Sequence, residues 1–143
     1  MRFSLEVSND PDEAFTAVAD FEKLEGWDPF VDRSELVAGA PMEPGAKYRL
    51  TTPRGMTLEY EIVEVDRPSR VVYRGGTKRV TSTDTISVHP HDGGSRVTVE
   101  SILEFDGWTR IIGPFVRMGV WLGGRTRSLP GMKRYLEELG DPS

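Results

Sequence analysis

The sequence predicts a single α+β domain in which a curved antiparallel sheet wraps around a long C-terminal helix. Three observations support this fold class. The chain has 143 residues, which is the length of one ordinary domain. Between residues 34 and 105 apolar and polar side chains alternate, and short turns separate the alternating stretches, as in consecutive antiparallel strands. After Gly107 the apolar spacing returns to the helical period.

A strand followed by two short helices is predicted for the first 26 residues. Residues 3–7 alternate between apolar and polar side chains, as in a strand with one buried face. Asp10 can cap a helix whose first turn contains Pro11. Asp20 can cap a second helix that ends at Gly26. The first strand should therefore lead directly into a helical cover.

About six strands are expected between residues 34 and 105. The alternation changes phase at Ile62 and Val63, which indicates a β-bulge or a bend. In the longest stretch, residues 80–88, the inward phase includes Asp84. Residues 89–94 are interpreted as the loop before the last strand.

A long helix is predicted to start near Thr109. Ile112, Phe115 and Leu122 share the face that should meet the sheet. Pro130 lacks a backbone donor and disturbs a helix interior, so we expect a kink or a break there.

The predicted sheet and helix leave room for an internal cavity, because the expected lining mixes aromatic with small side chains. Asp84 is the most unusual of these residues, since burial of an unpaired carboxylate is costly and should raise its pKa. It could bind a ligand hydroxyl or act as a general base. Alternatively, it hydrogen-bonds a neighbouring tyrosine or arginine, or is exposed by a different register, and the tyrosines fill the core. The residues predicted to line the cavity are Tyr48, Tyr60, Tyr73, Asp84, Ile112, Phe115 and Gly119.

Composition argues against several classes of protein. Without cysteine there is no disulfide framework and no thiolate site. His89 and His91 lie in a stretch that is interpreted as an exposed turn rather than a metal site, and we expect no cofactor. The net charge of −5 argues against nucleic-acid binding. No apolar run approaches the ~20 residues of a membrane span, and the absence of a signal-peptide core predicts a cytoplasmic location.

One face of the predicted C-terminal helix is basic and aromatic. Trp121 lies four residues from both Arg117 and Arg125. A solvated face with cation–π contacts is the simpler interpretation, and a surface for a partner is the alternative.

Several short motifs, taken in order, resemble one known superfamily. They are residues 3–7 and 10–15, 19–20 with 27–29, Gly45 with Tyr48, 60–68, 92–99 and 131–137. In these, the chain resembles the START-like helix-grip superfamily (SRPBCC), and most of all its polyketide cyclase/dehydrase branch. The resemblance covers nearly the whole chain, residues 1–143 as one domain, and implies a helix-grip fold. Members include lipid carriers, hormone receptors, aromatases and cyclases, so the fold alone does not imply one activity.

Three functions follow from these observations as hypotheses. The first is binding of a small hydrophobic or aromatic ligand, lipid- or polyketide-like, in the cavity between sheet and helix. The second is a polyketide cyclase or dehydratase that moves protons with Asp84 and a tyrosine. The third is an interaction module that uses the Trp121 face. A homodimer is compatible with each of them.

Overall fold

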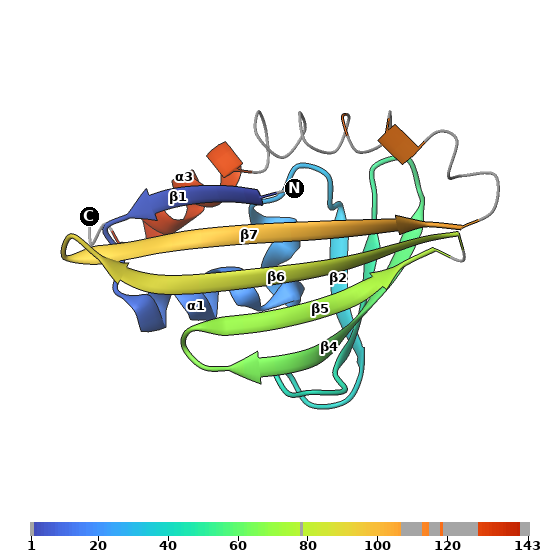
Figure 1. Cartoon of the computed structure of the whole chain (residues 1–143), viewed down its shortest axis with the longest axis horizontal. Helices are drawn as coiled ribbons and strands as arrows, with labels where there is room; N and C mark the ends of the chain where they lie inside the picture. Colours follow the sequence, from blue (N-terminus) through green and yellow to red (C-terminus); the bar gives the residue numbers. More distant parts are fainter. Residues whose placement is uncertain (1, 78, 107–112, 115–117, 119–128, 141–143) are drawn as a thin grey trace.

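The computed structural model describes residues 2–77, 79–106, 113, 114, 118 and 129–140. Within these residues the chain forms strands and helices in the predicted order (Figure 1). The elements are β1 (Arg2–Val7), α1 (Pro11–Ala19), the 3-10 helix η1 (Phe21–Gly26), β2 (Arg33–Ala38), β3 (Lys47–Thr51), β4 (Thr57–Asp66), β5 (Arg70–Gly76), β6 (Val80–His91), β7 (Gly94–Phe105) and α3 (Leu129–Gly140).

The strands form one antiparallel sheet in the order β1-β7-β6-β5-β4-β3-β2. Consecutive strands pair from β2 to β7, and β1 returns to the far edge beside β7, where Phe3 pairs with Val99. Figure 1 shows the sheet curving from the long β6–β7 ribbon towards β4. The predicted α+β class with a curved antiparallel sheet and a C-terminal helix is confirmed.

Both predicted helix caps are present. The Oδ1 atom of Asp10 accepts a hydrogen bond from the Glu13 backbone N–H at 2.9 Å, and Pro11 opens α1. The Oδ1 atom of Asp20 accepts one from the Glu22 N–H at 3.0 Å and caps η1. These contacts satisfy donors that the first turn of each helix leaves without an internal partner.

The predicted bulge is also present, whereas the predicted loop at residues 89–94 is shorter than expected. The β4–β5 register shifts between Ile62 and Glu64. β6 continues to His91 and β7 begins at Gly94, so only two residues form the turn. Both have positive φ, 46° at Asp92 and 78° at Gly93. Such a turn matches the twist of a hairpin, so the strand ladder extends to its tip.

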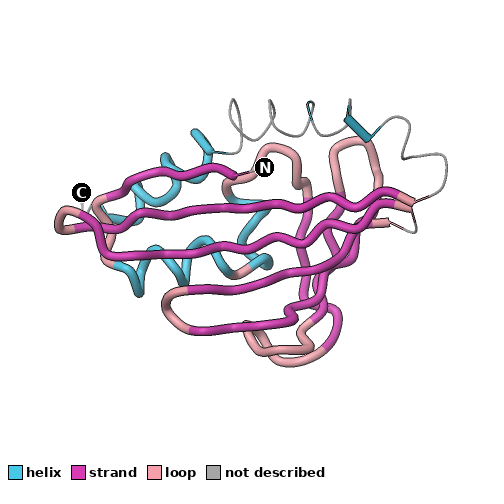
Figure 2. Tube along the Cα trace, in the orientation of Figure 1, coloured by secondary structure: helices cyan, strands magenta, loops and turns pink. Residues whose placement is uncertain are grey.

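Buried side chains from α1, η1, α3 and one face of the sheet form the core. Figure 2 shows α1 and α3 at the same end of the molecule, and the two helices are in contact. The Asn9 side-chain amide donates to the Leu136 carbonyl at 2.8 Å and ties α3 to the N-terminal segment. This contact positions α3 over the sheet.

Two predictions about the C-terminal region concern residues that lie wholly or partly outside the described part of the chain. The predicted helix start near Thr109 lies outside the described residues, and so do Ile112, Phe115 and Leu122, which were expected to face the sheet. Pro130 is the second residue of α3 as described. The predicted kink or break at Pro130 involves residues on both sides of it. The residues directly before Leu129 lie outside the described part of the chain.

Candidate functional site

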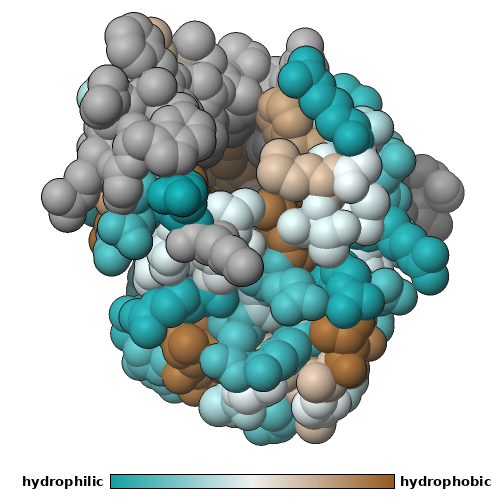
Figure 3. All heavy atoms as spheres, turned by 90° about the vertical axis from the view of Figure 1, so that its right-hand side faces the viewer, coloured by the Kyte–Doolittle hydropathy of each residue, from teal (hydrophilic) through white to brown (hydrophobic). Residues whose placement is uncertain are grey.

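A cavity of about 430 Å³ lies between the concave face of the sheet and the segments that cover it. Its volume is within the range of small-molecule sites, about 300–1,000 Å³. On the face shown in Figure 3 the surface is hollowed, and hydrophobic atoms lie inside the hollow. The described residues that line the cavity are Phe3, Phe21, Leu24, Trp27, Asp28, Phe30, Val31, Leu50, Thr52, Leu58, Tyr60, Asp84, Ile86, Val99, Ser101, Leu129 and Met132.

The wall on the sheet side follows from strand alternation. Side chains two residues apart point to the same face of a strand, so Leu58 and Tyr60 of β4 both reach the cavity. Asp84 and Ile86 of β6 also reach the cavity, and so do Val99 and Ser101 of β7. The wall is therefore built from several strands that are distant in the sequence.

Within the described residues, the cover includes η1, the segment after it, and α3. Asp28 stabilises this segment, because its Oδ1 atom accepts a hydrogen bond from the Phe30 N–H at 3.0 Å. Gly131 of α3 lies against the same segment, where an added Cβ would sit 2.4 Å from the Trp27 carbonyl oxygen. Only glycine lets the helix approach this closely, and the approach closes the cavity beside Met132.

Among the described lining residues, which are mostly apolar, Asp84 is a carboxyl group on a strand of the sheet. The Ser82 hydroxyl donates to Oδ1 of Asp84 at 2.7 Å. Ser101, which pairs with Asp84 across the β6–β7 ladder, also hydrogen-bonds the carboxyl group. Tyr60 interacts with the Ser82 side chain, so Tyr60, Ser82 and Asp84 form one polar cluster at the cavity wall.

A glycine lies between two members of this cluster in the sheet. Tyr60 pairs with Gly75, and Gly75 pairs with Ser82, so the three residues form one row across β4, β5 and β6. A Cβ at Gly75 would lie 2.0 Å from the Glu59 carbonyl oxygen. Since Gly75 has no side chain, those of Tyr60 and Ser82 can meet over it.

The surroundings of this group shift its titration. Burial raises the pKa of Asp84 above its ordinary value of 3.8, and hydrogen bonds from Ser82 and Ser101 oppose that rise. Burial also raises the pKa of Tyr60, with a smaller contribution from the negative charge of Asp84. The tyrosine therefore keeps its proton, and the carboxyl group binds a proton more readily than an exposed aspartate does.

Two of the predicted lining residues lie on the cavity wall, and two do not. Tyr60 and Asp84 face the cavity as predicted. Tyr48 and Tyr73 are completely buried behind Phe21, whose ring stacks on that of Tyr73 with centroids 3.5 Å apart. The predicted lining is therefore corrected. Both tyrosines point to the predicted face of the sheet, but Phe21 separates their rings from the cavity.

The hydroxyl groups of the two core tyrosines bond to the backbone. The Tyr73 hydroxyl donates to the Ala19 carbonyl at 2.7 Å and accepts from the Phe21 N–H at 3.3 Å. The Tyr48 hydroxyl accepts from the Met42 N–H at 3.1 Å. Burial raises the pKa of both tyrosines. The structure thus gives Tyr73 a role in fixing the helical cover to the sheet, whereas Tyr48 fixes the segment between β2 and β3.

The remaining predicted lining residues, Ile112, Phe115 and Gly119, lie outside the described part of the chain. Sequence reasoning missed the aromatic residues of the cover, among them Phe21 and Trp27. Trp27 follows Gly26, and nothing in the sequence shows that this segment folds over the sheet.

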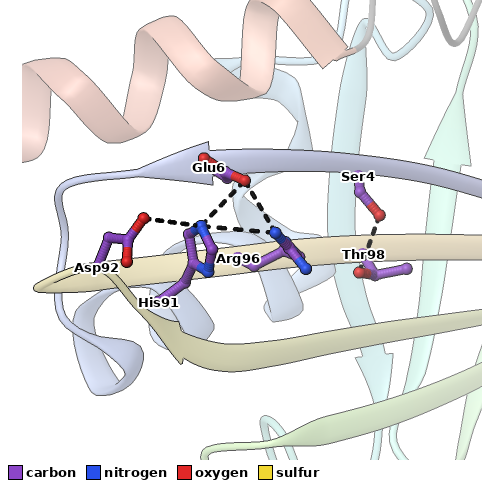
Figure 4. A network of polar contacts seen from close by, with 6 residues as sticks. All are labelled: Ser4, Glu6, His91, Asp92, Arg96 and Thr98. Carbon is purple, nitrogen blue, oxygen red and sulfur yellow. Dashed lines mark hydrogen bonds and ion pairs between the residues drawn. The ribbon is translucent and has the colours of Figure 1, made fainter.

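A second polar network lies on the surface, where the β6–β7 turn meets β1 (Figure 4). Glu6 contacts Arg96 at 2.9 Å and Nε2 of His91 at 3.1 Å, and His91 is 3.3 Å from Asp92. The hydrogen bond from Arg96, followed by the charge of His91, lowers the pKa of Glu6. Within the described residues no group of three or more histidine, aspartate or glutamate side chains could hold a metal ion.

The sequence of the chain matches a family described as polyketide cyclase / dehydrase and lipid transport, over residues 1–137. The chain belongs to this family. As a member of the polyketide cyclase/dehydrase and lipid transport family, it has the START-like fold that its sequence resembles. No curated protein matches the chain. Within its described residues, no helix is both long and apolar enough to cross a membrane.

Solved structures similar to this family member share its fold. The di-domain aromatase/cyclase StfQ from the steffimycin biosynthetic pathway has a TM-score of 0.75 and 18% identity, over 98% of this chain and 51% of StfQ. XoxI from Bacillus cereus has a TM-score of 0.71 and 20% identity, over 99% of this chain and 97% of XoxI. DynU16, a putative protein of the dynemicin biosynthetic locus, has a TM-score of 0.67 and 23% identity, over 99% of this chain and 48% of DynU16.

Proposed function

We propose that the protein binds one small hydrophobic or aromatic molecule, lipid- or polyketide-like, in its internal cavity. The observation that carries this proposal is the cavity of about 430 Å³, whose described wall is mostly apolar and includes a few polar side chains, Asp84 among them. A pocket of this kind gains affinity from apolar burial and orientation from its few polar groups. Membership of a family that includes lipid transport supports the same function.

Aromatic side chains on both sides of the cavity favour a flat ligand. Phe3 and Tyr60 come from the sheet, and Phe21 and Trp27 come from the cover. Rings that stack or meet edge to face with a ligand add about 0.5–1.5 kcal/mol beyond simple burial. The ligand should therefore contain at least one planar ring.

A fluorescent probe tests the proposal. N-phenyl-1-naphthylamine is neutral and aromatic, and we expect its fluorescence to rise when it enters the cavity. Val99→Trp should abolish that rise, because Val99 lines the cavity and the larger side chain would occupy it. Ile102→Trp is the matched control, since Ile102 lies in the same strand with 52% of its surface exposed. Equal binding to both folded variants would contradict the proposal.

One observation favours an enzyme as the second candidate. The polar cluster of Tyr60, Ser82 and Asp84 contains a carboxyl group with a raised pKa, and a base of this kind works closer to neutral pH. Such a group could move a proton during cyclisation or dehydration of a polyketone. Asp84→Asn should then slow turnover by about 10²–10⁴-fold while binding of the naphthylamine persists. Unchanged turnover in this variant would exclude Asp84 as the base.

Further proposals, about location and assembly, come from the sequence. We infer a cytoplasmic protein, which cell fractionation would test. A homodimer and a partner at the Trp121 face remain predictions, and Trp121 lies outside the described residues. Loss of a partner on Trp121→Ala, with probe binding unchanged, would support an interaction module.

A further inference from the structure

Trp27 contains a buried hydrogen-bond donor that has no partner among the described residues. Its side chain lines the cavity. The Nε1 atom of the indole ring is buried, and no described residue accepts a hydrogen bond from it. An indole N–H can only donate, so it needs an acceptor oxygen or nitrogen. A buried indole N–H usually has such a partner, because an unpaired buried donor costs about 1–3 kcal/mol.

Packing within the described residues does not account for this donor. One other buried side-chain atom among them lacks a partner, Oδ1 of Asn9, and Asn9 does not line the cavity. The amide nitrogen of Asn9 already donates to the Leu136 carbonyl, so that side chain has a structural role. At position 27, phenylalanine would supply an aromatic ring without the cost of an unpaired donor. The donor of Trp27 therefore points to a partner that enters the cavity.

The backbone of Trp27 is held in place on both sides. Its N–H donates to the Leu24 carbonyl at 3.1 Å. Its carbonyl oxygen lies against α3, 2.4 Å from the position that a Cβ on Gly131 would take. The residue as a whole is only half-buried, and the torsion about the Cβ–Cγ bond of tryptophan has broad preferences. The ring can therefore turn at this site while the backbone stays fixed.

We propose that Trp27 recognises the ligand of the cavity: its indole ring turns the N–H towards the cavity and donates a hydrogen bond to a carbonyl oxygen on an aromatic or apolar body. The inference rests on the proposed function, because it names the class of ligand for the same cavity. A ligand with a carbonyl oxygen satisfies the donor, whereas a pure hydrocarbon leaves it unpaired. A site with a buried polar group discriminates strongly against the analogue that cannot pair with it.

Two probes of the same shape isolate the carbonyl oxygen. 2-Acetylnaphthalene has a C=O group where 2-isopropenylnaphthalene has C=CH₂, and each is titrated against bound N-phenyl-1-naphthylamine. The measured quantity is the ratio of ketone affinity to hydrocarbon affinity. The two probes differ in their hydration, but that difference is the same for every variant. Trp27→Phe should lower the ratio by about tenfold, because it keeps an aromatic ring and removes the donor.

Phe3→Leu is the matched control. Phe3 also lines the cavity with an aromatic ring, and it has no side-chain donor to lose. The substitution should weaken the binding of both probes by a similar factor. The ratio of ketone affinity to hydrocarbon affinity should therefore stay within about twofold of wild type.

NMR spectroscopy detects the hydrogen bond in the unaltered protein. The chain has three tryptophans, and the indole N–H resonance that is missing from Trp27→Phe is that of Trp27. If that variant does not fold, sequential assignment identifies the resonance. Saturation with 2-acetylnaphthalene should shift the Trp27 N–H proton downfield of its position with 2-isopropenylnaphthalene. Both probes carry the same naphthalene ring, so the ring itself does not explain a difference between them.

The outcomes distinguish this inference from the function on which it rests. If Trp27→Phe keeps the wild-type ratio of affinities, or if the Trp27 N–H proton shifts equally with both probes, the inference is overturned and the proposed function stands. If neither probe displaces the naphthylamine, and Val99→Trp still binds it, the proposed function fails together with the inference.

Discussion

Burial of Asp84 costs stability, and it also makes the carboxyl group a better proton acceptor. Its carboxyl group sits among apolar side chains, and its described hydrogen-bond partners, Ser82 and Ser101, are uncharged. Desolvation disfavours the charged form, and two hydroxyl donors compensate only in part. The group is therefore sensitive both to pH and to any ligand that supplies a donor.

The stability of the protein should depend on pH through Asp84. The pKa of this group is raised above 3.8 in the folded protein, so the folded state binds its proton more tightly than the unfolded state. The resulting stabilisation is complete below the unfolded pKa and is lost as pH rises through the folded pKa. Asp84→Asn lacks this dependence and should gain in free energy of unfolding relative to wild type as pH rises. Urea unfolding of both proteins between about pH 3 and pH 8 measures the difference, and a difference independent of pH would contradict the raised pKa.

Tyr73 and Tyr60 should respond differently to loss of their hydroxyl groups. Tyr73→Phe removes the partner of the Ala19 carbonyl and of the Phe21 N–H, both buried, at a cost of about 1–3 kcal/mol in stability. Tyr60→Phe should cost less, because its hydroxyl is beside the cavity and Ser82 keeps Asp84 as a partner. Urea unfolding ranks the two variants. The opposite ranking would show that Tyr73 does not anchor the cover.

Alternation predicted the direction of individual side chains, and it could not predict what they meet. The phase of β6 indicated that Asp84 points inward, and the structure agrees. The same reasoning was right about the direction of Tyr48 and Tyr73 but not about the cavity, because Phe21 from a different element covers them. The row of Tyr60, Gly75 and Ser82 could not be predicted either, because it depends on the registers of two strand pairs.

At the scale of the element, local signals predicted the boundaries well. Asp10 and Asp20 cap the helices that they were expected to cap, and the phase change at Ile62 marks the bulge. Each of these features depends on a few neighbouring residues, so local sequence patterns predict it. The approach of α3 to the Trp27 segment depends on a distant contact at Gly131, which local patterns do not show.

Gly131→Ala should reverse the usual effect of this substitution in a helix. Alanine normally stabilises a helix by about 1 kcal/mol over glycine. Here its Cβ would lie 2.4 Å from the Trp27 carbonyl oxygen, so α3 must shift. We expect a loss of about 1–3 kcal/mol in stability and weaker binding of the naphthylamine probe.

Gly26→Ala is the control for this prediction. An added Cβ there has its nearest neighbour, Cε2 of Tyr135, at 4.0 Å, which is an ordinary contact. Denaturant unfolding should find this variant close to wild type. A Gly131→Ala protein that is more stable than wild type would show that the helix does not press on the segment that contains Trp27.

At the scale of the whole molecule, the cavity joins segments from across the chain. Phe3 near the start, Tyr60 in the middle and Met132 near the end of the chain all line it. The fold class and the consecutive pairing from β2 to β7 were predictable, because an antiparallel sheet with short turns follows from local patterns, whereas the pairing of β1 with β7 joins distant segments. The cavity was predictable only as a space between sheet and helix, since its volume and cover depend on all these segments together.

A ligand should stabilise the whole molecule. At a free concentration of N-phenyl-1-naphthylamine of about 100 times its dissociation constant, the free energy of unfolding should rise by about 2.7 kcal/mol. Val99→Trp should show no such rise, and Ile102→Trp should behave like wild type. Urea unfolding with and without the probe measures the effect. A similar rise in the Val99→Trp protein would place the probe outside the cavity.

The hydrogen bond from Asn9 to the Leu136 carbonyl has a consequence for the order of events along the folding pathway. The binding site is complete only when α3 has docked against the N-terminal segment, because Leu129 and Met132 of α3 line the cavity, so we expect a ligand to bind after the transition state for folding. Interactions that form after the transition state slow unfolding and leave the folding rate almost unchanged. A bound ligand should therefore lengthen the lifetime of the native state without making the protein fold faster.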